Sequence, residues 1–268
     1  MVSFNRTRTA HVRTLFLSDT HLGFKRARAR ELADFLLTID ADTIVMVGDI
    51  VDALSLSKRF FWSADHSRVV QALFAKRRAG ARLVYIPGNH DAALAPFAAM
   101  LRGQLEVHRE WVHRTARGER LLVLHGDQFD APTHIAGWLH RLGEAVYDFT
   151  VVLNDYLNDL RRLSRSSYWP LAERLKLAVS TSVRYIERFE EAALAHARAR
   201  GFDGIICGHI HRANLRRSGD SIYGNTGDWV ESCSALIEEA NGELRLWRLG
   251  GAAQVTLAHE PPLLADAA

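Results

Sequence analysis

The chain has 268 residues, 48% of them hydrophobic and 24% charged, which is typical of a folded globular protein and excludes a largely disordered chain. Its formal net charge is only +3, from 34 basic and 31 acidic residues, so no nucleic-acid partner is expected. The two cysteines, Cys207 and Cys233, lie too far apart in the chain for a CxxC pair and cannot build a disulfide framework. No apolar run approaches the length of a membrane span, about 18 residues, and no signal peptide is evident at the N-terminus. We therefore expect a cytoplasmic protein.

Short apolar runs alternate with amphipathic stretches through the first half of the chain, as expected of an α/β fold. Five of these runs predict buried strands: residues 13–17, 44–47, 83–86, 121–124 and 205–206. Helical periodicity appears at about residues 29–38 and 67–78. Each predicted strand ends at a polar motif, and functional residues of such sheets lie just beyond the C-terminal ends of the strands. That edge is therefore the candidate site.

The long stretch between His125 and His209 has mostly helical periodicity. Apolar residues at spacings of three and four predict one helix from Ile135 to Leu160, and a second helix follows Pro170. We interpret both as a helical cap insertion at about residues 131–200 of a single domain that covers residues 1–268. The apolar residues from Ile135 to Leu160, here called the apolar seam, have two open interpretations. They serve ordinary helix packing, or they line a lipid-binding pocket of the cap. Strand-like alternation returns at residues 234–239 and 243–249.

The polar motifs at the strand ends contain side chains that bind divalent metal ions. They are Asp-Thr-His, Gly-Asp-Ile-Val-Asp, Gly-Asn-His-Asp, His-Gly-Asp and Gly-His-Ile-His. The potential ligands within them are Asp19, His21, Asp49, Asn89, His125, His209 and His211. Seven such groups are more than one ion needs and suit two ions that share a carboxylate. Imidazole and carboxylate ligands without cysteine favour Mn²⁺, Fe²⁺ or Zn²⁺ over Ca²⁺.

The two pairs with one residue between them suggest how these ligands converge. In Asp19-x-His21 and His209-x-His211, alternate residues of an extended strand end are expected to point to one face. Each residue alone has a simpler explanation, since an Asp after a strand commonly caps a helix or forms a turn. A single histidine is likewise more often a hydrogen-bonded core or surface residue. Because five such motifs occur together, each after a predicted strand, we favour a metal site over these separate explanations.

The order and spacing of these motifs resemble the calcineurin-like metallophosphoesterase family, from about residue 13 to residue 230. The resemblance implies an α/β fold, a four-layer α-β-β-α sandwich with the helical cap inserted. It also implies two metal ions, with Asp49 as the shared ligand. The first ion takes Asp19, His21, Asp49 and His211, and the second takes Asp49, Asn89, His125 and His209.

The same resemblance implies catalytic roles for the residues that follow Asn89. His90 would face the substrate phosphate, either as a stabiliser of the transition state or as the acid for the leaving group. Asp91 is expected to orient the other nitrogen of His90, and Asp52 is expected to support the ligands from behind.

The insertion and the segment 225–232, Asn-Thr-Gly-Asp-Trp-Val-Glu-Ser, resemble the UDP-2,3-diacylglucosamine diphosphatase branch of this family. That branch is implied to hydrolyse a nucleotide-glycolipid pyrophosphate to UMP and 2,3-diacylglucosamine 1-phosphate in lipid A biosynthesis, usually with Mn²⁺. Arg174 and Lys176 of the insertion are the expected substrate contacts. One departure is that the best-known members of the branch carry Arg after the metal-binding Asn, where this chain has His90.

Other interpretations of partner and function stay open. The basic residues Lys25, Arg26, Arg28 and Arg30 suit peripheral contact with an anionic inner membrane, or form a solvated face. A phosphodiesterase or phosphatase of the same family, acting on another nucleotide or phosphorylated substrate, is the first alternative function. A non-catalytic metal-binding interaction module is the second. The sequence leaves the oligomeric state open.

Overall fold

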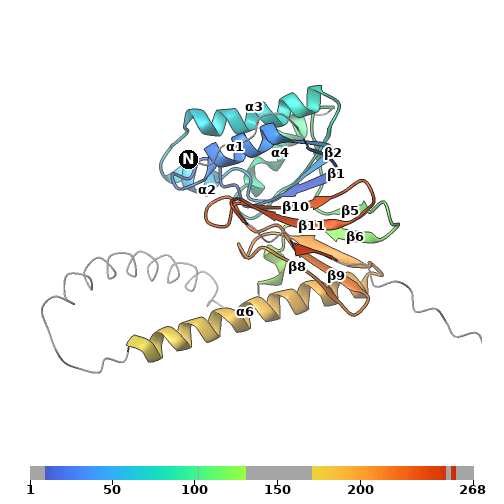
Figure 1. Ribbon diagram of the computed structural model, residues 1–268. Helices are drawn as coiled ribbons and strands as arrows, with labels where there is room; N and C mark the ends of the chain where they lie inside the picture. Colours follow the sequence, from blue (N-terminus) through green and yellow to red (C-terminus); the bar gives the residue numbers. More distant parts are fainter. Residues whose placement is uncertain (1–9, 102, 131–170, 252–254, 258–268) are drawn as a thin grey trace, which may run out of the picture. The chain divides into compact units, whose positions relative to one another are not determined.

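The computed structural model describes residues 10–101, 103–130, 171–251 and 255–257 (Figure 1). The chain divides into two compact units. Unit 1 consists of Met1–Asp127 and Ala193–Ala268, and unit 2 of Gln128–Ala192. Within the described ranges, no helix combines the length and the hydropathy that crossing a membrane requires.

Unit 1 contains a seven-stranded sheet in the order β12-β11-β10-β1-β2-β3-β4. Its strands are β1 (Ala10–Leu17), β2 (Ile39–Val47), β3 (Arg82–Ile86), β4 (Glu106–Val107), β10 (Ser234–Glu238), β11 (Leu244–Arg248) and β12 (Val255–Thr256). The strands β1 to β4 are parallel, whereas β10 runs antiparallel to β1. The carboxyl ends of β1, β2 and β3 therefore lie side by side at one edge.

A second, five-stranded sheet of unit 1 has the order β5-β6-β7-β9-β8. Its strands are β5 (Trp111–Arg114), β6 (Arg120–Val123), β7 (Gly204–Cys207), β8 (Asn214–Ser218) and β9 (Ser221–Asn225). The central strands β6, β7 and β9 are parallel. Their carboxyl ends also share one edge, so His125 and the Gly-His-Ile-His motif emerge next to each other.

Alternation of apolar side chains along the strands builds two cores. In β1, Phe16 packs into a core with Leu121 and Ile206 of the second sheet. Its neighbours Leu15 and Leu17 pack instead into a core with residues of α1 and α3. Because successive strand residues point to opposite faces, the first sheet is buried on both sides.

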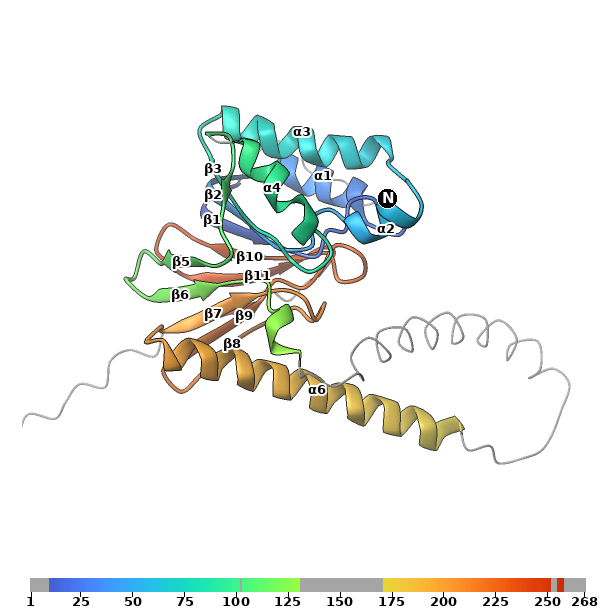
Figure 2. The same cartoon turned by 180° about the vertical axis from the view of Figure 1, so that it is seen from behind.

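Helices cover the outer face of the seven-stranded sheet (Figure 2). They are α1 (Ala29–Thr38), α2 (Ala53–Lys58), α3 (Ala64–Arg78) and α4 (Ala95–Ala98), with the 3₁₀ turns η1 (Ala92–Leu94) and η2 (Ala99–Leu101). A further 3₁₀ turn, η3 (Asp127–Phe129), follows β6. The helix α3 begins at a capping box, because the Ser63 side chain accepts from the His66 amide while His66 Nδ1 accepts from the Ser63 amide. The predicted α/β fold with its two packed sheets is confirmed.

The second helix predicted after Pro170 is also confirmed, as α6 (Leu171–Ala199). Its last residues belong to unit 1, where Ala193, Leu194 and Ala197 are buried and Arg198 Nε donates to Ser221 Oγ of β9. The predicted seam from Ile135 to Leu160 lies outside the described residues. The cap at about residues 131–200 therefore stays a prediction.

Candidate metal centre

The loops that follow β1 and β2 are tied to each other at the carboxyl edge of the sheet. The Asp19 amide donates to Gly48 O at 3.0 Å, and the His21 amide donates to Asp49 O at 3.0 Å. Asp19, His21 and Asp49 are all buried. The backbone therefore places three potential ligands in one compact space.

Most of the potential ligands adopt a left-handed backbone. Among the described residues, six non-glycine residues have positive φ, and five of them are potential ligands: Asp19 (49°), His21 (43°), Asp49 (54°), His209 (71°) and His211 (52°). Such conformations cost on the order of 1–3 kcal/mol each and persist only where the surrounding structure enforces them.

This backbone corrects one sequence-based expectation. The two Asp/His and His/His pairs were expected to share a face because they continue an extended strand. The strand β1 ends at Leu17, and β7 ends at Cys207, so both pairs lie in strained turns beyond the strands. The side chains still converge, but through turns held by hydrogen bonds between loops.

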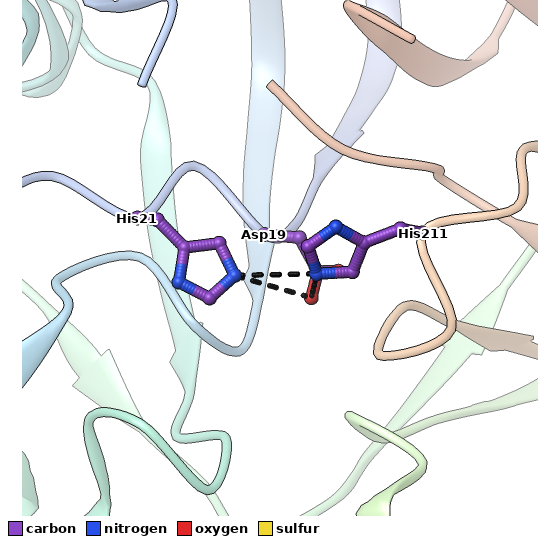
Figure 3. A group of neighbouring side chains, drawn as sticks. All are labelled: Asp19, His21 and His211. Carbon is purple, nitrogen blue, oxygen red and sulfur yellow. Dashed lines mark hydrogen bonds and ion pairs between the residues drawn. The ribbon is translucent and has the colours of Figure 1, made fainter. Parts of the chain in front are cut away.

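The first group of ligands consists of Asp19, His21 and His211 (Figure 3). His211 Nε2 lies 3.3 Å from Asp19 Oδ1 and 3.3 Å from His21 Nε2. His21 Nε2 lies 3.9 Å from Asp19 Oδ1. Buried Asp19 Oδ1 accepts no hydrogen bond from the described residues. One carboxylate oxygen and two imidazole nitrogens therefore converge on a space suited to a cation.

The second group consists of Asp49, His125 and His209, with Asn89 beside it. His125 Nδ1 lies 2.9 Å from Val47 O, an acceptor only, so this nitrogen carries the ring proton in the neutral form. His125 Nε2 then presents its lone pair 3.4 Å from Asp49 Oδ2 and 3.2 Å from Asn89 Oδ1. Three electron pairs that face one another require a proton or a metal ion between them.

Asp49 also joins a third group, with His21 and His90. Its Oδ2 lies 3.9 Å from His21 Nε2, while its Oδ1 accepts from the His90 amide at 2.8 Å. A Cβ atom on Gly88 would lie only 2.3 Å from Asp49 Oδ1, so the loop after β3 can approach only with glycine there. Asp49 therefore occupies the place that a shared ligand needs.

Burial and opposite charges shift the pKa values of these groups. Burial opposes the charged form of His125, but its hydrogen bond to Asp49 and the charge of Asp19 raise its pKa to about 10. For His211, burial is likewise outweighed by Asp19, and the pKa rises to about 9. Burial raises the pKa of Asp19, but the positive charge of His211 holds it well below its usual range. A site that draws protons onto its histidines also attracts a metal ion, which competes with those protons.

The contacts of His90 correct a second expectation. Asp91 is buried, and its carboxylate accepts from the amides of Gly88 at 2.6 Å and Ile50 at 2.7 Å. It thus ties the loops after β2 and β3 together and does not orient the His90 ring. The carboxylate that meets His90 Nδ1, at 3.1 Å, is Asp52 Oδ1.

Asp52 links His90 to the ligands. Its Oδ2 lies 3.4 Å from His21 Nδ1, so one carboxylate holds both rings. Asp52 is itself fixed as the N-cap of α2, where it accepts from Ser55 N at 2.8 Å. The hydrogen bond to Asp52 raises the pKa of His90 above its usual value, and burial, which favours the neutral ring, opposes this shift only in part.

Two residues near this site were not predicted from the sequence, and the side chains of two predicted ones lie outside the described residues. Ser18 and Thr226 contact each other behind Asp19, although they are 208 positions apart in the chain. Their spacing in the sequence gives no sign of this contact. The fold brings them together because Ser18 follows the end of β1 and Thr226 follows the end of β9. Arg174 and Lys176, the predicted substrate contacts, belong to α6, but their side chains lie outside the described residues. Their role stays a prediction.

Comparisons with known proteins identify the family of the chain. A sequence model of the calcineurin-like phosphoesterase family matches residues 12–213, three quarters of the chain. A protein of Proteus mirabilis, UDP-2,3-diacylglucosamine hydrolase, is 32% identical over 123 residues, and the match covers 42% of this chain. The chain thus spans about half of that relative, 48% of its length.

A solved structure supports the same fold. A single mutant of Vps29 from Entamoeba histolytica superposes with a TM-score of 0.50 at 14% sequence identity. The match covers 91% of this chain and 99% of the Vps29 chain. The two sheets, the clustered Asp and His residues and the family match over residues 12–213 agree, and the chain belongs to the calcineurin-like phosphoesterase family.

Proposed function

We propose that the protein is a dimetal phosphoester hydrolase. The observation that carries this proposal is the linkage of the three groups of potential ligands, because the third group shares His21 with the first and Asp49 with the second. We assign Asp19, His21 and His211 to one ion and Asn89, His125 and His209 to the other, with Asp49 shared. The donor set suits Mn²⁺, which we propose as the native ion, and is also compatible with Fe²⁺ or Zn²⁺.

His90 is the proposed catalytic residue beside these ligands. When bound, two divalent ions polarise phosphoryl oxygens and lower the pKa of water. His90 Nδ1 is held by Asp52, so its Nε2 is the nitrogen left to meet a substrate. There it would donate a proton to the leaving oxygen or neutralise charge on the phosphoryl group. Asp91 supports this arrangement by joining the two loops that carry Asp49 and His90.

The proposed substrate is a nucleotide glycolipid, UDP-2,3-diacylglucosamine. Hydrolysis of its pyrophosphate would release UMP and 2,3-diacylglucosamine 1-phosphate, a step of lipid A biosynthesis. Support comes from the name of the Proteus mirabilis relative and from the segment 225–232. Arg174 and Lys176 are the proposed contacts to the diphosphate. We further propose a cytoplasmic enzyme in peripheral contact with the anionic inner membrane, which sedimentation with anionic liposomes would test.

A second candidate is hydrolysis of another nucleotide or phosphorylated substrate. His90 favours it, because the best-known members of the glycolipid branch have Arg at the corresponding position. A non-catalytic module has the least support, since its mark would be missing ligands and all seven potential ligands are present.

Hydrolysis of two substrates side by side separates these candidates. The purified protein with Mn²⁺ is incubated with UDP-2,3-diacylglucosamine or with bis(p-nitrophenyl) phosphate, and products are identified by mass spectrometry. UMP released by the protein, but not by Asp49→Ala, supports the glycolipid assignment. Cleavage of the simple diester alone would keep the hydrolase and reject the glycolipid. No cleavage of either substrate would argue against the catalytic proposal.

A further inference from the structure

The two carboxylate oxygens of Asp19 have unequal surroundings. Oδ2 accepts from the His209 amide at 2.9 Å and from the Ser18 hydroxyl. Oδ1, equally buried, accepts no hydrogen bond from the described residues and faces His211 Nε2 at 3.3 Å. Asp19 Oδ2 is thus hydrogen-bonded to the protein, whereas Asp19 Oδ1 points toward the other potential metal ligands. This asymmetry fixes the orientation of the carboxylate.

The Ser18 hydroxyl that meets Asp19 is itself part of a chain of hydroxyl groups. Ser18 Oγ contacts Thr226 Oγ1 and lies 3.0 Å from Gly227 O. A serine hydroxyl donates only one proton, and a charged carboxylate is a stronger acceptor than a peptide oxygen. The consistent arrangement is that Thr226 donates to Ser18 and Ser18 donates to Asp19 Oδ2. Thr226 Oγ1 has a second acceptor, Cys207 O, only at the longer distance of 3.4 Å.

Three separate segments hold this chain of hydroxyls in place. The Thr226 amide donates to Cys207 O at 3.0 Å, and the Trp229 amide donates to Asp19 O at 3.0 Å. A Cβ atom on Gly208 would lie 2.4 Å from both Asp19 Oδ2 and Ser18 Oγ. The ends of β1, β7 and β9 therefore pack together closely at this point, and Ser18, Asp19 and Thr226 are all buried.

We propose that Ser18 and Thr226 are positioning residues of the metal centre, which aim Asp19 Oδ1 at the first ion through the hydroxyl chain. The inference rests on the proposed dimetal function and extends it to residues that contact neither ion nor substrate. Groups that hydrogen-bond a metal ligand from behind typically change affinity about 10- to 100-fold when removed. The same range is expected here for the Ser18 hydroxyl.

Mn²⁺ binding to the metal-free full-length chain tests this role without reference to turnover. Ser18→Ala and Thr226→Val remove one hydroxyl each, and Thr226→Ser keeps the hydroxyl. Calorimetric titration is expected to show one of two Mn²⁺ sites weakened about 10- to 100-fold in Ser18→Ala and about tenfold in Thr226→Val. Thr226→Ser is expected to bind like the unaltered protein, and electron paramagnetic resonance of bound Mn²⁺ should change in the same order.

Ser221→Ala is the matched control, because it also removes a buried hydroxyl. The Ser221 hydroxyl lies in β9 and accepts a hydrogen bond from Arg198 of α6. It should leave Mn²⁺ affinity unchanged, and melting of every metal-free variant separates loss of the site from loss of the fold. Ser18→Ala that binds Mn²⁺ as tightly as the unaltered protein would overturn the inference. Failure of Thr226→Ser to restore binding would overturn the role of the Thr226 hydroxyl. If the unaltered protein binds no Mn²⁺, the proposed function itself fails.

Discussion

Substitution of Gly88 by alanine probes how closely the site is packed around Asp49. The added Cβ would lie 2.3 Å from Asp49 Oδ1 and 2.7 Å from Asp49 N. Because real Cβ contacts are essentially never below 3.0 Å, Asp49 or the loop after β3 must move by at least about 0.7 Å. The second contact is with backbone, so a side-chain rotation of Asp49 does not relieve it. Either the backbone of Asp49 or the loop that carries Asn89 must therefore shift, and each of them holds a potential ligand.

We expect Gly88→Ala to lose about 1–3 kcal/mol of folding stability. A displacement near 1 Å in a catalytic site can reduce turnover about 100-fold, and loss of ligand orientation reduces metal affinity about 10- to 100-fold. Mn²⁺ titration by calorimetry and urea unfolding measure the two effects separately. Gly80→Ala is the control, since Gly80 has φ of +111° but no atom within 4 Å of its added Cβ.

Gly80→Ala should lose stability through backbone strain alone and keep its Mn²⁺ affinity. Binding of two Mn²⁺ ions by Gly88→Ala with the affinity of the unaltered protein would show that the added Cβ does not displace the ligands. Equal loss of metal in Gly80→Ala would contradict the local displacement too, because general destabilisation would then explain both results.

Three further substitutions separate binding, positioning and folding. His90→Ala should retain Mn²⁺ affinity but lose turnover about 100- to 10,000-fold, and an unchanged kcat would remove its proposed role. Asp52→Asn should lower kcat and weaken Mn²⁺ binding together, because Asp52 contacts both His90 and His21; an effect on neither would show that these contacts are incidental. Glu238→Gln tests stability in acid. Burial opposes ionisation of Glu238, but hydrogen bonds from His113 and Arg13 lower its pKa to about 2 in the folded protein. This pKa lies below that of Glu in the unfolded chain, so the ionised carboxylate stabilises the fold above about pH 4.5. That contribution, about 3 kcal/mol in total, is lost as the pH falls toward 2. Urea unfolding across this range should show the difference between the unaltered protein and Glu238→Gln shrinking with falling pH, and a constant difference would contradict the assignment.

The positions of the potential ligands could be predicted because strand direction determines them. The motifs that contain Asp19, Asp49 and Asn89 follow three parallel neighbours, β1, β2 and β3, and the motifs of His125 and His209 follow β6 and β7. Apolar runs that end in polar residues reveal such strands directly. The short strands β8 and β9 were not predicted, because Arg216 and Arg217 interrupt the first and Gly224 the second.

The conformation of the site could not be predicted, since it depends on contacts between loops. Left-handed backbone at Asp19 or His21 has no local sequence signal, because hydrogen bonds to Gly48 and Asp49 on another loop enforce it. Asp91 was assigned to His90 because the two are adjacent in the chain. Adjacent side chains diverge in this turn, and the partner of His90 is Asp52, from the loop after β2.

The most direct test of the dimetal proposal is the rate of bis(p-nitrophenyl) phosphate hydrolysis during a stepwise addition of Mn²⁺ to the metal-free protein. Protein concentration is kept above the dissociation constant, so that added ions bind stoichiometrically. We expect no hydrolysis without metal and a rate that reaches its plateau at two Mn²⁺ ions per chain, with none in Asp49→Ala. A plateau at one ion, or hydrolysis that does not depend on metal, would contradict the shared two-ion centre.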